Sequence, residues 1–286
     1  MAHDRTILIT GVTGQQGGAV AQALRDTGLH LRGLTRKPDS ERAAALARLG
    51  VDVVKGDLDD EATLRRALAG AWGVFGVQNA GEAGVEREEE QGKRLATLAR
   101  EAGVEHYVYS SVGSANKRTG VPHFDSKGRI EDAVRGLGFP SHVILRPVFF
   151  MENLLAPYTL QGSTLAVALA PSVKLQMIAV EDIGWFGARA FTHAAALNRR
   201  EIDIAGDART MPESAEILTK ALGRPIAFAQ TPIEQVRQFS KDVALMMEWF
   251  ENVGYSADIG GLEREFGRKL TKLPDWAARH ARPNAR

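Results

Sequence analysis

The stretch TILITGVTGQQGGAV (residues 6–20) joins an apolar run to three evenly spaced glycines and then to small and apolar residues. Residues 6–10 are leucine or β-branched, as is typical of a buried strand, and Val20, Ala23 and Leu24 fall at helical spacing. Glycines between a strand and a helix let a pyrophosphate approach backbone N–H groups at the positive helix end. The stretch therefore predicts the first βα unit of a nucleotide-binding α/β fold.

The same alternation of short apolar runs and amphipathic helical patterns continues through the first half of the chain. Apolar strands between amphipathic helices are typical of a parallel sheet that is covered on both faces. Right-handed crossovers then make the sheet doubly wound, so we predict a Rossmann-type doubly wound parallel sheet. Further strands are predicted at residues 30–35, 51–54, 74–77, 106–110 and 141–146.

After Pro147 the alternation changes to a hairpin-like segment, a further amphipathic helix and a late strand, followed by mostly helical patterns. This change predicts a smaller, interleaved C-terminal α+β domain on the substrate side. The expected bounds are residues 1–148 and 177–206 for the Rossmann domain, and residues 149–176 and 207–286 for the smaller domain.

Composition excludes several classes of protein. The 286 residues are 44% hydrophobic and 25% charged, which is ordinary for a globular protein. Lys plus Arg is 36 against 35 acidic residues, so no nucleic-acid partner is expected. No apolar run reaches bilayer-spanning length, so no membrane partner is expected either.

The chain has no cysteine, which removes disulfides, thiolate nucleophiles and cysteine-ligated metals together. Its seven histidines show no ligand spacing such as H-E-x-x-H, so no metal is expected. The N-terminal MAHDR carries charge where a secretory signal would be apolar, and we therefore expect a cytoplasmic protein.

The glycine loop is G-x-x-G-x-x-G, formed by Gly11, Gly14 and Gly17, and is one residue longer than the usual dinucleotide fingerprint. The end of the second strand bears on which dinucleotide is bound, because NAD sites place an acid there and NADP sites a cation. Arg36 and Lys37 occupy that end and favour NADP(H), while Asp39 keeps NAD open as the alternative.

Polar residues follow the other strands as well. Asp57, or the neighbouring Leu58, is a candidate for contact with the adenine ring, although Asp57 could equally cap the next helix. Gln78 and Asn79 follow the fourth strand and are candidates to line the ribose. Ser110 and Ser111 follow the fifth strand, without a G-x-S-x-G motif, and are expected to line the cofactor cleft.

Six segments, in order and spanning nearly the whole chain, resemble the NmrA-like family of atypical short-chain dehydrogenase/reductases, and its NADPH-sensing branch most of all. They are GVTGQQGGAV, LTRKP, GDLDD, EQGKRLATLAREAGVEHYVYSS, HFDSKG and RPVFFMENLL. The resemblance implies an NADP-binding Rossmann domain and a smaller domain that together form a cleft. Some members of the family reduce quinones or dyes, and others bind the cofactor and partner proteins without evident turnover.

Residue roles also follow from the resemblance. It implies that Arg36 binds the 2′-phosphate, that Lys127 reaches the nicotinamide ribose, and that Pro147 and Phe149 border the nicotinamide. The residues implied to line the phosphates are Gly11, Thr13, Gly14, Gln16 and Gly17.

The segment HFDSK (residues 123–127) ends in a lysine but begins with histidine where short-chain dehydrogenases have a proton-donating tyrosine. Tyr107 and Tyr109 lie in a predicted buried strand and are expected to belong to the core. His123 is a candidate catalytic proton donor, because its ordinary pKa of about 6.5 suits that work, and the alternative is that it begins a helix. Lys127 keeps its place at the ribose in either case.

Two functions remain open from the sequence. The missing tyrosine favours an NADP(H)-binding redox sensor that acts on a regulatory protein partner. The alternative is an NADPH-dependent reductase of quinones, azo dyes or related conjugated acceptors, since such acceptors can take hydride first and a proton from water. We expect a monomer or a homodimer.

Overall fold

The computed structural model describes residues 5–281. Residues 1–4, which belong to the N-terminal MAHDR on which the expected cytoplasmic location rests, lie outside that range. The chain forms two compact units. The first unit comprises Met1–Asn116, His123–Arg146 and Ile183–Ile202, and the second comprises Lys117–Pro122, Pro147–Asp182 and Asp203–Arg286. The domain bounds given from the sequence stay a prediction.

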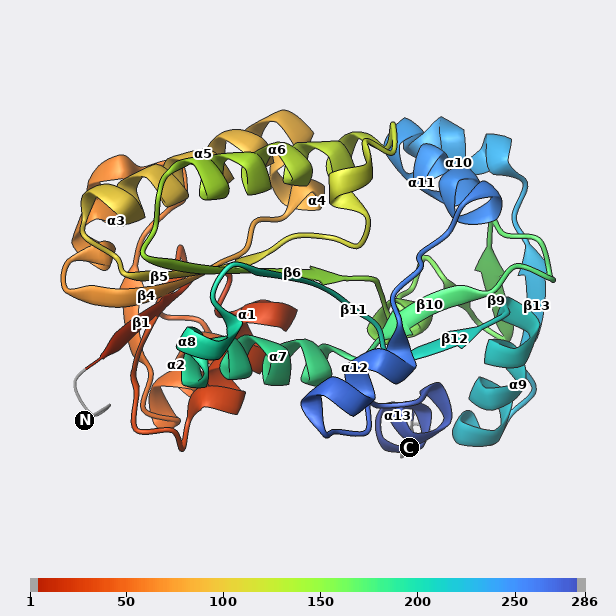
Figure 1. Cartoon of the computed structure of the whole chain (residues 1–286). Coiled ribbons are helices and arrows are strands. Elements are labelled where there is room, and N and C mark those ends of the chain that lie inside the picture. Colours follow the sequence, from red (N-terminus) through yellow and green to blue (C-terminus); the bar gives the residue numbers. More distant parts are fainter. Residues whose placement is uncertain (1–4, 282–286) are drawn as a thin grey trace. The chain divides into compact units, whose positions relative to one another are not determined.

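A central sheet with the strand order β11-β6-β5-β4-β1-β2-β3 organises the first unit (Figure 1). β1 pairs in parallel with β2 and with β4, and the pairs β2–β3, β4–β5 and β5–β6 are also parallel. The strands are β1 (Thr6–Ile9), β2 (His30–Thr35), β3 (Asp52–Lys55), β4 (Ala71–Gly76), β5 (His106–Ser110), β6 (Ser141–Pro147) and β11 (Arg200–Ile204). The predicted Rossmann-like, doubly wound fold is confirmed. Strand order reverses at β1, and the carboxyl ends of β1 and β4 therefore form the switch point at which open α/β sheets bind ligands.

Helices cover both faces of this sheet (Figure 1). One face carries α1 (Gln15–Leu24), α2 (Glu41–Arg48), α7 (Val180–Thr192) and α8 (Ala194–Leu197). The other carries α3 (Glu61–Leu68), α4 (Ala80–Ala83), α5 (Val85–Glu101) and α6 (Pro122–Gly136), and a short 3-10 turn, η1 (Ala115–Lys117), precedes α6. The core beneath α3, α5 and α6 is apolar and fully buried, with Leu64, Leu95 and Ile130 at 0% exposure. Burial of this kind is the main driving force for packing the helices onto the sheet.

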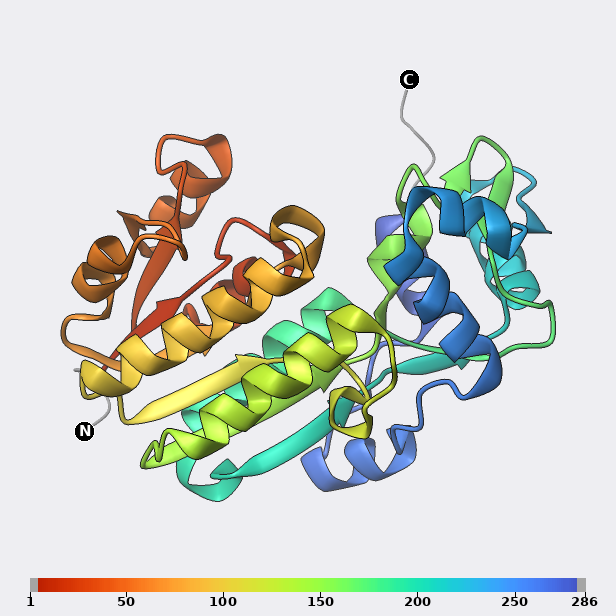
Figure 2. The ribbon, with the colours of Figure 1, turned by 90° about the horizontal axis from the view of Figure 1, so that it is seen from above.

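α5 and α6 run side by side over the sheet (Figure 2). They approach closely at Gly92, where a Cβ atom would lie 2.5 Å from Cδ1 of Ile130. Real side chains do not tolerate that distance, so a larger residue at position 92 would force the Ile130 side chain to move. One turn before this contact, the same two faces carry Glu88 and Lys127.

The second unit contains small sheets with the strand orders β12-β10-β7 and β13-β9-β8. Their strands are β7 (Phe149–Phe150), β8 (Leu160–Gln161), β9 (Thr164–Val167), β10 (Leu175–Ile178), β12 (Asp207–Arg209) and β13 (Ala227–Gln230). The helical elements are η2 (Met151–Leu155), α9 (Met211–Leu222), α10 (Ile233–Phe239), α11 (Lys241–Asn252), α12 (Ile259–Phe266) and α13 (Leu273–His280). Within residues 5–281, no helix combines the length and the apolar character needed to cross a bilayer.

Glu152, in the MENLL turn η2, holds parts of the second unit together. Its Oε1 accepts hydrogen bonds from the backbone N–H of Val180 at 3.0 Å and from the Nε1–H of Trp276 at 3.0 Å. Burial raises the pKa of this carboxyl above its ordinary value, although these bonds and His280 oppose the rise. The ENLL segment therefore carries a packing contact between η2 and α13.

One buried histidine should make stability depend on pH. His106 in β5 is 1% exposed, its Nδ1 lies 2.8 Å from Ser141 Oγ, and its Nε2 lies 3.0 Å from the carbonyl oxygen of Ala190. Burial lowers its pKa from 6.5 to about 4, against the opposing effect of the Ala190 carbonyl. Between those pH values the unfolded chain binds a proton that the folded chain does not. We predict that this group lowers the free energy of unfolding by up to about 3 kcal/mol as the pH falls from about 6.5 to about 4.

Urea unfolding at several pH values in that window tests the prediction, with the variant His106→Gln as the comparison. Glutamine can still bond to Ser141 and Ala190 but does not titrate. A variant whose stability falls with pH as steeply as that of the natural chain would contradict the assignment to His106.

Candidate functional site

The loop between β1 and α1 presents backbone N–H groups at the switch point. Gly11 has φ +58°, a left-handed conformation that favours glycine, and its carbonyl accepts a hydrogen bond from Gly14 N–H at 2.9 Å. A Cβ atom on Gly17 would lie 2.4 Å from the Gly11 oxygen and 2.6 Å from the Thr10 oxygen, so only glycine lets α1 begin this close to the loop. Among the described residues, no side chain caps the N-terminus of α1 at Gly14. These N–H groups are thus left for an anion, as in dinucleotide phosphate sites.

The side chain of Gln16, in the first turn of α1, is held in place by a residue at the end of β5. The buried hydroxyl of Ser110, at the end of β5, donates to Gln16 Oε1 at 2.5 Å. The structure therefore brings together two residues that the sequence placed in the cofactor site. Thr13 is half-buried, and its carbonyl accepts a hydrogen bond from Arg42 Nη1 at 3.2 Å.

The cations predicted to select NADP lie at the end of β2. Arg36 and Lys37 are both exposed, as is Asp39. Nη2 of Arg36 lies 2.7 Å from Oε2 of Glu82 in α4, with both side chains about 60% exposed. Arg42, on α2 beside the glycine loop, adds another guanidinium to this area that the sequence reasoning missed. The Glu82 carboxylate would therefore compete with a phosphate for Arg36.

Asp57 and Leu58 follow β3, the neighbour of β2 in the sheet. The Asp57 Oδ1 accepts a hydrogen bond from Asp59 N–H at 3.0 Å, whereas the cap of α3 is Asp60, which accepts from Thr63 N–H at 3.2 Å. The alternative reading of Asp57 as a helix cap was therefore wrong. Leu58 is half-buried and packs against the core. Contact of either residue with adenine stays a prediction.

Gln78 and Asn79 follow β4 at the switch point. Gln78 is 6% exposed, and neither its side-chain oxygen nor its nitrogen has a hydrogen-bond partner among the described residues. Such a group is costly to bury unless a ligand or water satisfies it. Asn79 is exposed, and its side chain caps α4 by accepting from Gly81 N–H at 3.0 Å. Gln78 is therefore a candidate for contact with a polar ligand, and its place at the ribose stays a prediction.

Lys127 reaches the same place from α6. Its Nζ lies 3.5 Å from the carbonyl oxygen of Gln78 and 2.7 Å from Oε1 of Glu88 on α5. The Lys127 side chain is 11% exposed, and the Glu88 side chain is 0% exposed. The sequence predicted Lys127 but not Glu88, which lies in the strongly charged stretch VEREEE and reads there as part of a solvated helix face.

His123 lies one helical turn before Lys127 on α6. It is half-buried, with its ring 4.7 Å from that of Phe124 in an edge-on arrangement. Its role in proton transfer stays a prediction. Tyr107 and Tyr109 are both fully buried, and burial raises the pKa of each phenol above its ordinary value. The expectation that these tyrosines belong to the core is confirmed.

Ser111 is part of an internal ion-pair cluster. Its hydroxyl donates to Oε1 of Glu131 at 2.6 Å, and the guanidinium of Arg146 donates to both oxygens of the same carboxylate at 2.8 and 2.6 Å. Glu131 is 0% exposed and Arg146 3% exposed. The hydroxyl proton of Ser111 is therefore used within this cluster, and its place in the cofactor cleft stays a prediction.

Pro147 and Phe149 belong to the second unit. Pro147 is buried at the end of β6, and Phe149 in β7 is half-buried with its ring 6.4 Å from that of Phe250. That they border a nicotinamide stays a prediction.

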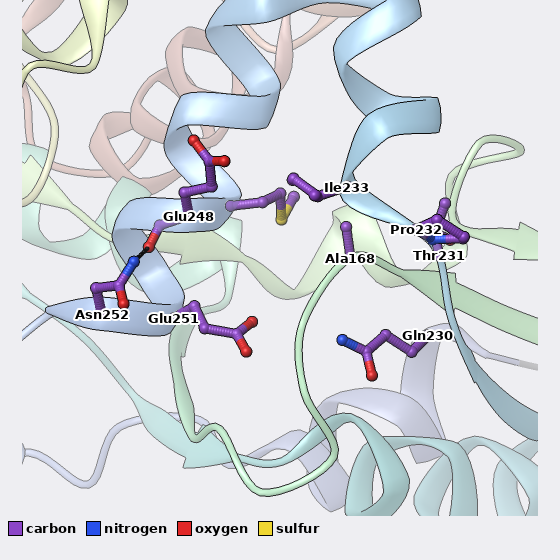
Figure 3. A pocket seen from close by; sticks show the side chains of 9 residues that line it. Ala168, Gln230, Thr231, Pro232, Ile233, Glu248, Glu251 and Asn252 are labelled. Atoms are coloured by element: carbon purple, nitrogen blue, oxygen red, sulfur yellow. Dashed lines mark hydrogen bonds between the residues drawn. The ribbon is translucent and has the colours of Figure 1, made fainter.

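The second unit also has a cavity of about 420 Å³ near β13, α10 and α11 (Figure 3). It contains none of the predicted site residues, and its lining residues are Ala168, Gln230, Thr231, Pro232, Ile233, Met247, Glu248, Glu251 and Asn252. Residues 5–281 contain no group of three or more His, Asp or Glu side chains placed to hold a metal ion.

The sequence profile of the NmrA-like family matches residues 3–279. The chain belongs to the NmrA-like family. It is 30% identical over 287 residues to a (4-alkanoyl-5-oxo-2,5-dihydrofuran-3-yl)methyl phosphate reductase from Streptomyces griseus subsp. griseus, covering 96% of this chain and 98% of that protein.

Solved structures with the same fold include both an enzyme and a regulator. An NADPH-dependent quinone oxidoreductase of Escherichia coli, complexed with NADPH, superposes with a TM-score of 0.81 and 25% identity over 96% of this chain and 99% of that chain. NmrA, a negative transcriptional regulator, in complex with NADP, gives a TM-score of 0.80 over 97% of this chain and 95% of that chain. Its identity is 17%, so this second likeness shows the fold alone.

The contact of Gly17 with the loop backbone predicts the effect of adding one methyl group. Gly17→Ala would force its Cβ against the Gly11 and Thr10 carbonyl oxygens, which cannot move aside as a flexible side chain would. We expect the free energy of unfolding to fall by about 1–3 kcal/mol, as for other overpacked sites. Urea unfolding measures it. Gly136→Ala, in open space at the end of α6, is the control and should cause no loss. Equal stability of both variants would contradict the prediction.

Proposed function

We propose that the protein binds NADP(H) in its first unit and uses NADPH to reduce a small conjugated acceptor. The observation that carries the reductase part is the match, at 30% identity over nearly its whole length, to a protein named as a reductase. The NADPH-dependent quinone oxidoreductase supports it at 25% identity over nearly its whole length, whereas the regulator shares only the fold.

The residues of the first unit fit the cofactor. The uncapped start of α1, with Gly11, Gly14 and Gly17, would hold the pyrophosphate, since backbone N–H groups there lack side-chain partners. Arg36 and Lys37, with Arg42 nearby, would hold the 2′-phosphate, because a guanidinium matches the geometry of a phosphate. The buried amide of Gln78 and the ammonium group of Lys127 would bind the ribose of the nicotinamide half.

The acceptor class follows from the names of the relatives and from the missing tyrosine. Bound NADPH supplies a hydride. A quinone and the dihydrofuranone in the relative's name share a carbon–carbon double bond conjugated to a carbonyl, and electrons from hydride addition can delocalise onto the carbonyl oxygen. Such an acceptor needs no strong acid at the moment of transfer, so water or His123 would suffice as the proton donor. The lack of a tyrosine in the HFDSK frame is compatible with this chemistry.

A redox sensor is the second candidate function. It is favoured by one observation, that histidine begins the HFDSK frame while Tyr107 and Tyr109 are fully buried. In this case cofactor binding would change a surface that a regulatory protein recognises, without turnover. The cytoplasmic location and the oligomeric state, a monomer or a homodimer, stay predictions.

The two functions differ in turnover. NADPH oxidation should be measured against quinones, azo dyes and enones, with simple aldehydes as non-conjugated comparisons, and NADPH binding should be measured separately. We expect turnover with at least one conjugated acceptor, and a loss of about tenfold or more in Lys127→Ala, because the lysine orients the cofactor. Tight NADPH binding with no turnover across the panel would overturn the reductase and leave the sensor.

The Arg36–Glu82 pair predicts opposite effects of two substitutions on cofactor choice. Arg36→Ala removes a charge-assisted contact and should weaken NADPH binding by about tenfold or more while leaving NADH binding unchanged. Glu82→Gln frees the arginine from an exposed ion pair worth about 0.2–1 kcal/mol, and should strengthen NADPH binding up to about fivefold. Titration calorimetry with both cofactors measures this. If Arg36→Ala weakens NADH and NADPH equally, Arg36 does not contact the 2′-phosphate.

A further inference from the structure

The buried carboxylate of Glu88 contacts Lys127 and two further residues near it. Its Oε1 lies 2.7 Å from Lys127 Nζ and accepts a hydrogen bond from Ala80 N–H at 3.0 Å, and its Oε2 accepts from Ser126 Oγ at 3.3 Å. The donors come from α4 and α6, while Glu88 itself is on α5. The carboxylate therefore joins three helices at the end of β4.

Burying this carboxylate is costly, because taking an ion out of water costs several kcal/mol even after relaxation. A well-packed apolar pair of similar volume is often as stable as a buried ion pair. Fold stability alone therefore gives no strong reason for charges at these two positions. The reason is clearer if the charge of Lys127 is used by a ligand.

The two buried glutamates of the first unit differ in how they are paired. Both oxygens of Glu131 accept from the guanidinium of Arg146, which is 3% exposed, and Oε2 also pairs with Arg135 at 2.7 Å. Lys127 remains partly exposed, and its ammonium has three N–H groups. In residues 5–281 its recorded acceptors are the Glu88 carboxylate and, at the long distance of 3.5 Å, the Gln78 carbonyl. At least one N–H thus remains for a ligand beside the unsatisfied Gln78 amide.

We propose that Glu88 is a positioning residue that fixes the ammonium of Lys127 so that its remaining N–H meets the ribose hydroxyls of the nicotinamide half of NADP(H). The inference rests on the proposed binding of NADP(H) in the first unit. Glu88 acts only through Lys127 and does not touch the adenosine half of the cofactor. The close approach of α5 and α6 at Gly92 keeps the two side chains within contact distance.

The test compares two probes in the full-length chain. NADPH carries the nicotinamide ribose, whereas adenosine 2′,5′-bisphosphate carries only the adenosine half with its phosphates. In Glu88→Gln we expect NADPH binding to weaken by about tenfold or more, as for loss of a charge-assisted contact, and the bisphosphate to bind within about twofold of the natural chain. Glu90→Gln is the matched control, since Glu90 is exposed on the same helix, and should change neither affinity.

A double-mutant cycle separates positioning from general structure. In a Lys127→Met background, Glu88→Gln should have no further effect on NADPH binding, because the group through which it acts is gone. Equal weakening of both probes, or a further loss in the Lys127→Met background, would show a structural role and overturn the proposal. Unchanged NADPH binding in Glu88→Gln would overturn it too.

Two further outcomes are distinguishable. If Glu88→Gln does not fold, Glu88→Asp keeps the charge but draws the carboxylate back by one methylene, and it should weaken NADPH binding while leaving the bisphosphate unaffected. If Glu88→Asp binds NADPH as tightly as the natural chain does, the proposal fails. If the natural chain binds neither probe, the proposed NADP(H) site itself fails, and the inference fails with it.

Discussion

The contact between Gly17 and the backbone of residues 10 and 11 is the constraint on which the cofactor site depends. It lets α1 begin directly against the loop that leaves β1, at the point where the strand order reverses. A methyl group at position 17 would displace α1, and its first N–H groups would no longer point at the same place. The approach of Ser110 to Gln16 follows from the same placement, because α1 is close enough for a side chain of β5 to reach it.

The buried carboxylates of Glu88 and Glu131 lie on neighbouring helices but differ in their partners. Glu131 is surrounded by Ser111, Arg135 and Arg146, which together pair both of its oxygens. Glu88 faces Lys127 beyond the end of β4, where the side-chain amide of Gln78 has no partner among the described residues. The polar atoms of the first arrangement are paired by other side chains of the chain, whereas beside the second the Gln78 side chain has no partner among the described residues.

Much of the fold could be predicted because its signals are local. The glycine loop, the alternation of strands and helices, and the burial of Tyr107 and Tyr109 follow from spacing within a few residues. Asp57 was weighed as a cap because Asp57, Asp59 and Asp60 are all residues that cap helices well, and only the observed start of α3 chooses among them. Glu88 was missed because its partner lies on another helix. Gly92 was the available signal, since a glycine inside a helical pattern often marks a close neighbour.

The exposure of the Arg36–Glu82 pair bears on how ionic strength affects cofactor preference. Both partners are exposed, so dissolved salt screens their attraction over about 8 Å at physiological ionic strength. Salt weakens the attraction of Arg36 for a 2′-phosphate in the same way. Because the competitor and the ligand are screened together, the preference for a phosphorylated cofactor should vary less with ionic strength than it would for an arginine that stands alone.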